Sequence, residues 1–270
     1  MNALPTAQKK RMAVFKFASC DGCQLSLLNC EDELLALADQ VEILHFLELT
    51  SRVQPGPFDL TLVEGSISTN KDIERIREIR RQSRVLVTIG ACATSGGIQS
   101  LRNWADHDEY LQCVYARPEY IDSLATSTAI SQHVKVDFEL RGCPVNNQQL
   151  LQVIIAFLHE RRPSIPSHSV CLDCKRRGVV CIAITQGKPC LGPVTQSGCG
   201  AICPAYDRAC YGCFGPAAQA NPRPLSQHYT SHGVTKREMI HQLRNMNAAS
   251  EVFQIESDRL ETKTGSKPPK

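Results

Sequence analysis

The chain has 270 residues, of which 42% are hydrophobic and 21% are charged. These values are ordinary for a globular protein and exclude the disordered and collagen-like classes. The net charge of +3 is too small to indicate nucleic-acid binding, and basic residues are mixed with acids, as in DIERIREIRR at 72–81. The length allows one sizeable core and a smaller appended unit, so we expect two domains.

The sequence gives no sign of membrane insertion or export. No apolar run approaches the roughly 18 residues that cross a bilayer. Lys9, Lys10 and Arg11 precede a short stretch that contains Lys16 and reaches Cys20, which leaves no room for a signal-peptide core. Fourteen cysteines without an export signal indicate a reducing, cytoplasmic location, where clustered thiols usually bind metal.

Short apolar runs alternate with helical patterns between residues 11 and 163, which predicts a parallel sheet covered by helices. We expect strands at 12–18, 41–47, 60–64, 85–89 and 134–140. Apolar residues at helical spacing predict helices at 24–38, 70–81 and 146–161, with Asn70 as an N-cap. The expected fold class is α/β, a flavodoxin-like doubly wound parallel sheet with a second, smaller irregular domain.

The composition changes after Pro163 and Pro166, because cysteine, glycine and proline dominate residues 171–216. No strand or helix pattern persists there, so bound metal would have to stabilise a segment with so little apolar surface. A helix is expected at 235–246, followed by a polar, mobile tail. The expected domains are 11–163 with the sheet, 164–233 with most of the cysteines, and 234–270 with the terminal helix and tail.

Three of the expected strands lead directly into cysteines. Cys20 and Cys23 follow the first strand, Cys92 follows the fourth and Cys143 follows the fifth. The carboxyl ends of parallel strands share one edge, where ligands bind, so these four thiols are expected to converge. Four thiolates are the ligand set of a 4Fe-4S cluster. The alternatives are buried structural thiols or a zinc site, while no phosphate-binding glycine motif follows any strand.

Eight more cysteines lie in the second domain, which is the number that two further 4Fe-4S clusters require. Sequence order divides them into Cys171, Cys174, Cys181 and Cys190 on one hand and Cys199, Cys203, Cys210 and Cys213 on the other. Interleaved ligation is common in ferredoxins, so other partitions stay open. The second domain is thus expected to be an iron-sulfur domain, and the chain to hold three 4Fe-4S clusters.

Four other side chains near these cysteines have two interpretations each. His168 stands three residues before Cys171 and is an alternative ligand, although four thiols are already available. Cys30 lies inside a helical pattern and Cys113 in an irregular stretch, so both are expected to be packed thiols rather than ligands. Glu64 ends a strand at the cysteine-bearing edge, where it either tunes a cluster and relays protons or serves as a capping or salt-bridged acid.

The cysteine motifs resemble those of the small, electron-transferring subunit of nickel-iron hydrogenases over residues 12–216. The matching stretches are CDGCQLSLL, LVEGSIS, IGACATSGGI, RGCPVN, CLGPVTQSGC and CYGCFGP. The resemblance implies that the four sheet-edge cysteines form a proximal set. It further implies that the four from Cys171 to Cys190 form a distal set and the four from Cys199 to Cys213 a medial set.

Two positions indicate the subtype. Exported members of that family have histidine where this chain has Cys171 and proline where it has Cys203, and their medial cluster is 3Fe-4S. Thiols at both positions imply three 4Fe-4S clusters and resemble the cytosolic enzymes, particularly the sulfhydrogenase delta subunit. The related quinone-reductase subunit has adjacent cysteines and one cluster, a pattern that this sequence lacks.

The resemblance also implies a function and partners. The chain would be a non-catalytic hydrogenase subunit that relays electrons between the nickel-iron centre of a large subunit and a flavin or iron-sulfur partner that reduces NAD(P). It has no matching ligand set for the nickel-iron centre itself. The alternatives are the same relay to a deazaflavin, sulfur or heterodisulfide acceptor, and a zinc-stabilised scaffold subunit without redox activity.

Overall fold

The computed structural model describes residues 9–262 of the chain. Five parallel strands form one sheet in the order β2-β1-β3-β4-β5, which is the flavodoxin-like order and confirms the expected fold class. The strands are β1 (Lys10–Lys16), β2 (Val41–His45), β3 (Phe58–Glu64), β4 (Ser83–Ile89) and β5 (Phe138–Leu140). Strand β5 is shorter than the predicted 134–140, because Val134 and Val136 pack against the core from a loop.

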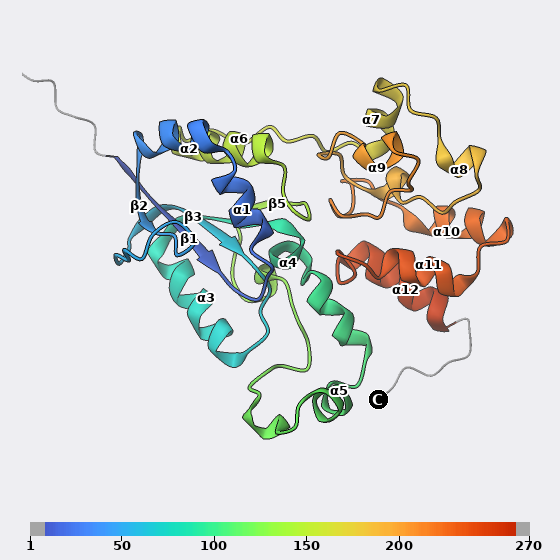
Figure 1. Cartoon of the computed structure of the whole chain (residues 1–270), viewed down its shortest axis with the longest axis horizontal. Helices are drawn as coiled ribbons and strands as arrows, with labels where there is room; N and C mark the ends of the chain where they lie inside the picture. Colours follow the sequence, from blue (N-terminus) through green and yellow to red (C-terminus); the bar gives the residue numbers. More distant parts are fainter. Residues whose placement is uncertain (1–8, 263–270) are drawn as a thin grey trace, which may run out of the picture.

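Helices cover both faces of the sheet, which explains why the central residues of its strands are mostly apolar (Figure 1). Successive side chains of a strand point to opposite faces. Accordingly, Met12 of β1 packs beneath α1 (Gly22–Leu28), α2 (Glu31–Ala38) and α6 (Asn147–Leu158). The next residue, Ala13, packs on the other face with α3 (Asn70–Gln82).

The helices of this domain differ from the predictions in two details. The single helix predicted at 24–38 is divided at Asn29 and Cys30, where the N–H of Cys30 donates to the carbonyl of Leu27 at 3.1 Å. The N-cap of α3 is Thr69 rather than Asn70, because the Thr69 hydroxyl accepts from the N–H of Asp72 in a capping box.

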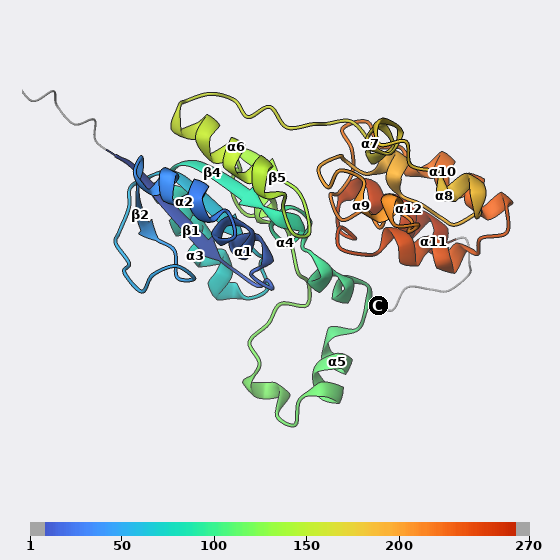
Figure 2. The same cartoon turned by 45° about the horizontal axis from the view of Figure 1, so that its top comes forward.

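A long excursion connects β4 to β5. It begins with α4 (Gly90–Ser95) and the 3-10 helix η1 (Ile98–Trp104), and it continues through α5 (His107–Val114), η2 (Pro118–Tyr120) and η3 (Ile130–Gln132). In both views α5 projects away from the sheet, and it has no buried residue (Figures 1 and 2). Cys113 therefore lies on an exposed helix and not in the irregular stretch that was predicted.

The second unit, residues 164–262, is more regular than predicted. It contains four short helices and three longer ones: α7 (Val170–Arg176), α8 (Ile182–Thr185), η4 (Gly192–Val194), α9 (Ile202–Ala205), α10 (Pro222–Ser231), α11 (Lys236–Leu243) and α12 (Glu251–Thr262). Helix α11 falls within the predicted helix at 235–246. The prediction of a mobile tail is wrong for α12, and residues 263–270 lie outside the described residues.

An apolar core accounts for the longer helices. Phe253 and Leu260 of α12 pack with Leu191 and Val194 and with side chains of α10 and α11. Metal is therefore not the only source of stability in this unit. The described residues contain no helix that is both long and apolar enough to span a bilayer.

Candidate metal centres

The carboxyl edge of the sheet brings the proximal set together. Cys20 and Cys23 follow β1, Cys92 lies in α4 directly after β4, and Cys143 follows β5. The Cys23 thiol interacts electrostatically with Cys92 and Cys143, and Cys92 interacts with Cys20, so all four lie around one point. Cys20 and Cys143 are exposed while Cys23 is buried, which leaves one side of this site open to solvent.

Two glycines keep the backbone close to these thiols. A Cβ on Gly90 would lie 2.4 Å from the Sγ of Cys23, and one on Gly97 would lie 2.6 Å from the Sγ of Cys92. Both glycines also have positive φ, +86° and +65°, which side-chain-bearing residues rarely adopt. A side chain at either position would displace a thiol of the proximal set.

Glu64 ends β3 at the same edge and is almost fully buried. Its two carboxylate oxygens accept hydrogen bonds from the backbone N–H groups of Cys23 and Gln24, each at 3.1 Å. Burial raises the pKa of the Glu64 carboxyl, while these hydrogen bonds oppose the shift. Glu64 therefore acts as a cap for the start of α1, in agreement with the plainer of the two interpretations.

The distal set forms at the start of the second unit. Cys171 and Cys174 lie on α7, Cys181 precedes α8, and Cys190 precedes η4. Cys171 interacts electrostatically with the other three. A Cβ on Gly192 would lie 3.4 Å from the Sγ atoms of both Cys171 and Cys190, so the space between these thiols is narrow on that side.

The medial set lines a cavity of about 710 Å³. Its four cysteines are Cys199, Cys203, Cys210 and Cys213, and Cys143 of the proximal set lines the same cavity. The Cys213 thiol interacts electrostatically with three of these neighbours, including Cys143. On the far side, the N–H of Cys210 donates to the Sγ of Cys190 at 3.2 Å. The medial set thus adjoins the proximal set on one side and the distal set on the other.

The partition by sequence order stays a prediction, because Cys174 interacts electrostatically with Cys199, and Cys203 and Cys210 both interact with Cys190. The remaining cysteines and His168 lie apart from the sets. The Nε2 of His168 is 3.3 Å from Asp173 Oδ1, and the buried Cys30 donates its thiol to the carbonyl of Ser26 at 3.3 Å. Cys113 is exposed on α5, so the expectation that it is a packed thiol is wrong.

The thiols themselves fit a metal-binding role. Burial, and then the neighbouring cysteines, raise the pKa of Cys171 to about 11 and that of Cys213 to about 12. Burial likewise raises the pKa of Cys92 to about 11. It raises the pKa values of Cys23 and Cys210 more than that of Cys92. Without metal these thiols stay protonated at neutral pH. A bound iron cluster would supply the positive charge that stabilises several thiolates so close together.

A buried amide joins the two units, and sequence reasoning did not find it. The Ser95 hydroxyl at the end of α4 donates to Asn247 Oδ1 at 2.8 Å. The Asn247 Nδ2 donates to the carbonyl oxygens of Gly212 at 2.9 Å and Cys213 at 3.1 Å. Asn247 therefore connects the helix that bears Cys92 to the loop that bears Cys213.

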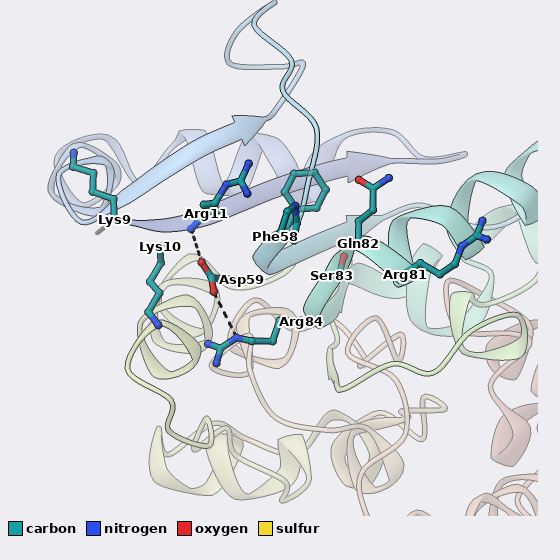
Figure 3. Close-up of a pocket in the computed structure, with 10 residues that line it drawn as sticks. Lys9, Lys10, Arg11, Phe58, Asp59, Arg81, Gln82, Ser83 and Arg84 are labelled. Atoms are coloured by element: carbon teal, nitrogen blue, oxygen red, sulfur yellow. Dashed lines mark hydrogen bonds and ion pairs between the residues drawn. The ribbon is translucent and has the colours of Figure 1, made fainter. Parts of the chain in front are cut away.

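A second cavity, of about 660 Å³, lies at the opposite edge of the sheet and is lined by basic residues (Figure 3). Its cations point in different directions, and Lys10 and Arg84 have acidic partners. Arg84 lies 3.6 Å from Asp59 and 3.1 Å from Glu160, and Lys10 lies 3.4 Å from Glu160. No cysteine lines this cavity, so it has no part in the metal centres.

The fold and the three cysteine sets define a class of protein, the small subunits of oxidoreductase complexes in which a flavodoxin-like sheet presents cysteines at its carboxyl edge. Residues 20–157 match the family model described as the 20 kDa subunit of NADH ubiquinone oxidoreductase, and the chain belongs to this family.

Its relatives include hydrogenase subunits, as the motifs indicated. The chain is 36% identical over 211 residues to the sulfhydrogenase 2 subunit delta of Pyrococcus furiosus. The aligned region covers 78% of this chain and 88% of that protein. A chain of an NAD+-reducing NiFe hydrogenase matches with a TM-score of 0.55 and 30% identity, covering 59% of this chain and 96% of the other.

A third match concerns the fold alone, because its identity is 16%. A chain of the NiFeSe hydrogenase of Dm. baculatum matches with a TM-score of 0.57 and covers 81% of this chain and 99% of the other. The matches with hydrogenase subunits confirm the resemblance to a small hydrogenase subunit of the sulfhydrogenase delta type.

Proposed function

We propose that this chain is the electron-transfer subunit of a nickel-iron hydrogenase and relays electrons through three 4Fe-4S clusters. One end of the relay is the nickel-iron centre of a large subunit, and the other is a flavin or iron-sulfur partner that reduces NAD(P). The observation that carries the proposal is the order of the cysteine sets. Cys143 adjoins the medial set and Cys190 adjoins Cys210, so three four-thiol sites follow one another across the molecule.

Each residue has a defined part in this proposal. The proximal, medial and distal sets would each hold one cluster, and such clusters supply one-electron redox steps when bound. Gly90 and Gly97 keep backbone close to the proximal thiols, and Glu64 fixes the start of α1. The open side of the proximal set, where Cys20 is exposed, is the surface available to a large subunit.

The comparisons support NAD(P) as the acceptor. One matched solved structure is an NAD+-reducing NiFe hydrogenase, and the match covers 59% of this chain. A purified complex that contains no flavin subunit would be inconsistent with this acceptor. It would favour the alternative relay to a deazaflavin, sulfur or heterodisulfide acceptor.

The rival function is a zinc-stabilised scaffold subunit. The medial set lines a cavity of about 710 Å³, which has room for a cubane cluster and for a single zinc ion. Four thiolates suit either group, so the metal content of the protein decides between the two functions.

Metal analysis of the full chain, purified without oxygen, separates the two functions. The relay predicts about twelve irons and about twelve sulfides per chain, with a broad absorbance near ~400 nm that dithionite bleaches. Colourless, zinc-loaded protein would reject the relay. Nickel in a subunit that copurifies would support assembly with a hydrogenase large subunit.

A further inference from the structure

Apolar side chains surround the distal set at the molecular surface. Cys181 is exposed, and next to it Val180 and Ile184 are 67% and 79% exposed. Leu172 of α7 is also exposed, at 36%. We call these four residues the distal patch: Leu172, Val180, Cys181 and Ile184.

Two backbone hydrogen bonds return the segment that bears Val180 and Cys181 toward the end of α7. The N–H of Gly178 donates to the carbonyl of Lys175 at 3.1 Å, and the N–H of Val179 donates to that of Cys174 at 3.0 Å. These bonds turn the chain back directly after α7, so that the segment leading to Cys181 returns beside the helix end. Figures 1 and 2 place α8, which follows Cys181, on the side of the second unit away from the sheet.

Positive charge borders the distal patch. The last turn of α7 continues into three consecutive exposed cations, Lys175, Arg176 and Arg177. The only acid between residues 171 and 190 is Asp173. Its carboxylate accepts a hydrogen bond from the Ser197 hydroxyl and is mostly buried, so it does not neutralise the exposed cations.

An exposed apolar cluster with a charged border is typical of a protein interface. Removal of water from the apolar centre contributes binding free energy, and the charges at the border select a partner of opposite charge. Nothing within the second unit covers Ile184, which lies on a four-residue helix that buries only Ile182. The location beside the distal set connects this surface to electron transfer.

We propose that the distal patch is the docking site of an acidic electron-transfer protein. The inference rests on the proposed function, because the partner would exchange one electron per encounter with the distal set. The chain loses that electron when the acceptor gains it, and no proton or bond is exchanged. The cations of α7 attract the acidic partner, and Val180 and Ile184 contact its apolar centre.

The test uses the full chain loaded with iron and sulfide, and an acidic plant-type 2Fe-2S ferredoxin as the probe. Binding is measured by calorimetry at low and high salt. The double variant Lys175→Glu with Arg176→Glu should weaken binding about tenfold or more at low salt and remove most of the salt dependence. The matched control, Lys71→Glu with Arg77→Glu, makes the same charge change on exposed residues of α3 and should leave binding within about twofold.

A second variant tests the apolar part without touching the charges. Ile184→Ser should weaken ferredoxin binding about fivefold or more while the salt dependence stays as in the parent chain. Its side chain is exposed, so folding and iron content should not change. A basic cytochrome c is the opposite-charge probe and should bind more weakly than the ferredoxin at low salt.

Two kinds of failure are distinguishable. A chain that holds no iron and transfers no electrons to a small dye would defeat the proposed function itself. A chain with about twelve irons that reduces the dye, but binds ferredoxin equally in the parent, double variant and Ile184→Ser forms, would overturn the docking site alone. Tighter binding of the basic cytochrome c would also overturn it.

Discussion

Asn247 is expected to be the polar contact on which the association of the two units depends most. Its side chain accepts one hydrogen bond from Ser95 and donates two, to the carbonyl oxygens of Gly212 and Cys213. The residue is 3% exposed, so water cannot replace these bonds when the amide is removed. Replacement by alanine leaves both carbonyl oxygens buried without this donor.

The expected loss of stability follows from the number of hydrogen bonds that Asn247 makes. Each buried hydrogen bond contributes roughly 1 kcal/mol, so Asn247→Ala should lower the free energy of unfolding by about 3 kcal/mol. For a chain of this size that corresponds to a fall of roughly 6–12 °C in the unfolding temperature. Asn247→Asp should be at least as destabilising, because a carboxylate oxygen would face the two carbonyl oxygens that now accept from Nδ2.

Thermal and urea unfolding of the iron-loaded chain measure these effects. Ser95→Ala is the comparison variant, because it removes one of the three Asn247 bonds together with the Ser95 bond to the Ala91 carbonyl, and it should lower stability by about 1–2 kcal/mol. Two outcomes would refute the reasoning: Asn247→Ala unfolding within about 1 °C of the parent chain, or Ser95→Ala being as destabilising as Asn247→Ala.

Three further predictions concern the metal centres and the sheet. Gly90→Ala should lower the iron content by about four per chain, because its Cβ would lie 2.4 Å from Cys23 Sγ, whereas Gly178→Ala, with open space around it, should keep all the iron. Chelation of the iron should make residues 171–216 more sensitive to proteolysis than α10–α12, because most side chains of the apolar core of these helices come from α10–α12 themselves and, of its buried members, only Leu191 and Val194 come from the cysteine-bearing segment; equal cleavage of both segments would contradict this. Burial, and then Arg75, lower the pKa of His45 below 6.5, so the unfolded chain binds the proton more readily and stability should fall as the pH drops through 6.5. His45→Gln should show a smaller fall between pH 7.5 and 5.5 in urea unfolding, and an unchanged fall would reject this cause.

The sheet and the proximal set followed from the sequence because both depend on simple rules. Strands buried on both faces are mostly apolar, as β3 and β4 are at their centres, and their parallel order forces the cysteines after β1, β4 and β5 to one edge. The grouping of the second-unit cysteines by sequence order stays a prediction, since each set spans a short stretch of chain but cysteines of the two sets also interact.

Other features depend on contacts between distant residues and were not predictable. Asn247 lies 152 residues from Ser95, and no local pattern marks it. Helix α12 was missed because its polar residues dominate, although Phe253 and Leu260 are one heptad apart and line the same core. The break at Asn29 and Cys30 was missed because apolar residues continue at helical spacing on both sides of it.

The most direct test of the three-site relay is the number of clusters that accept an electron. Anaerobically purified full chain would be reduced stepwise, with iron and sulfide counted and the spins quantified by electron paramagnetic resonance. The account predicts about twelve irons and three one-electron centres per chain, with Cys203→Ser altering one centre and Cys113→Ser none. A single reducible centre with about four irons would contradict it, because only the proximal set would then bind a cluster.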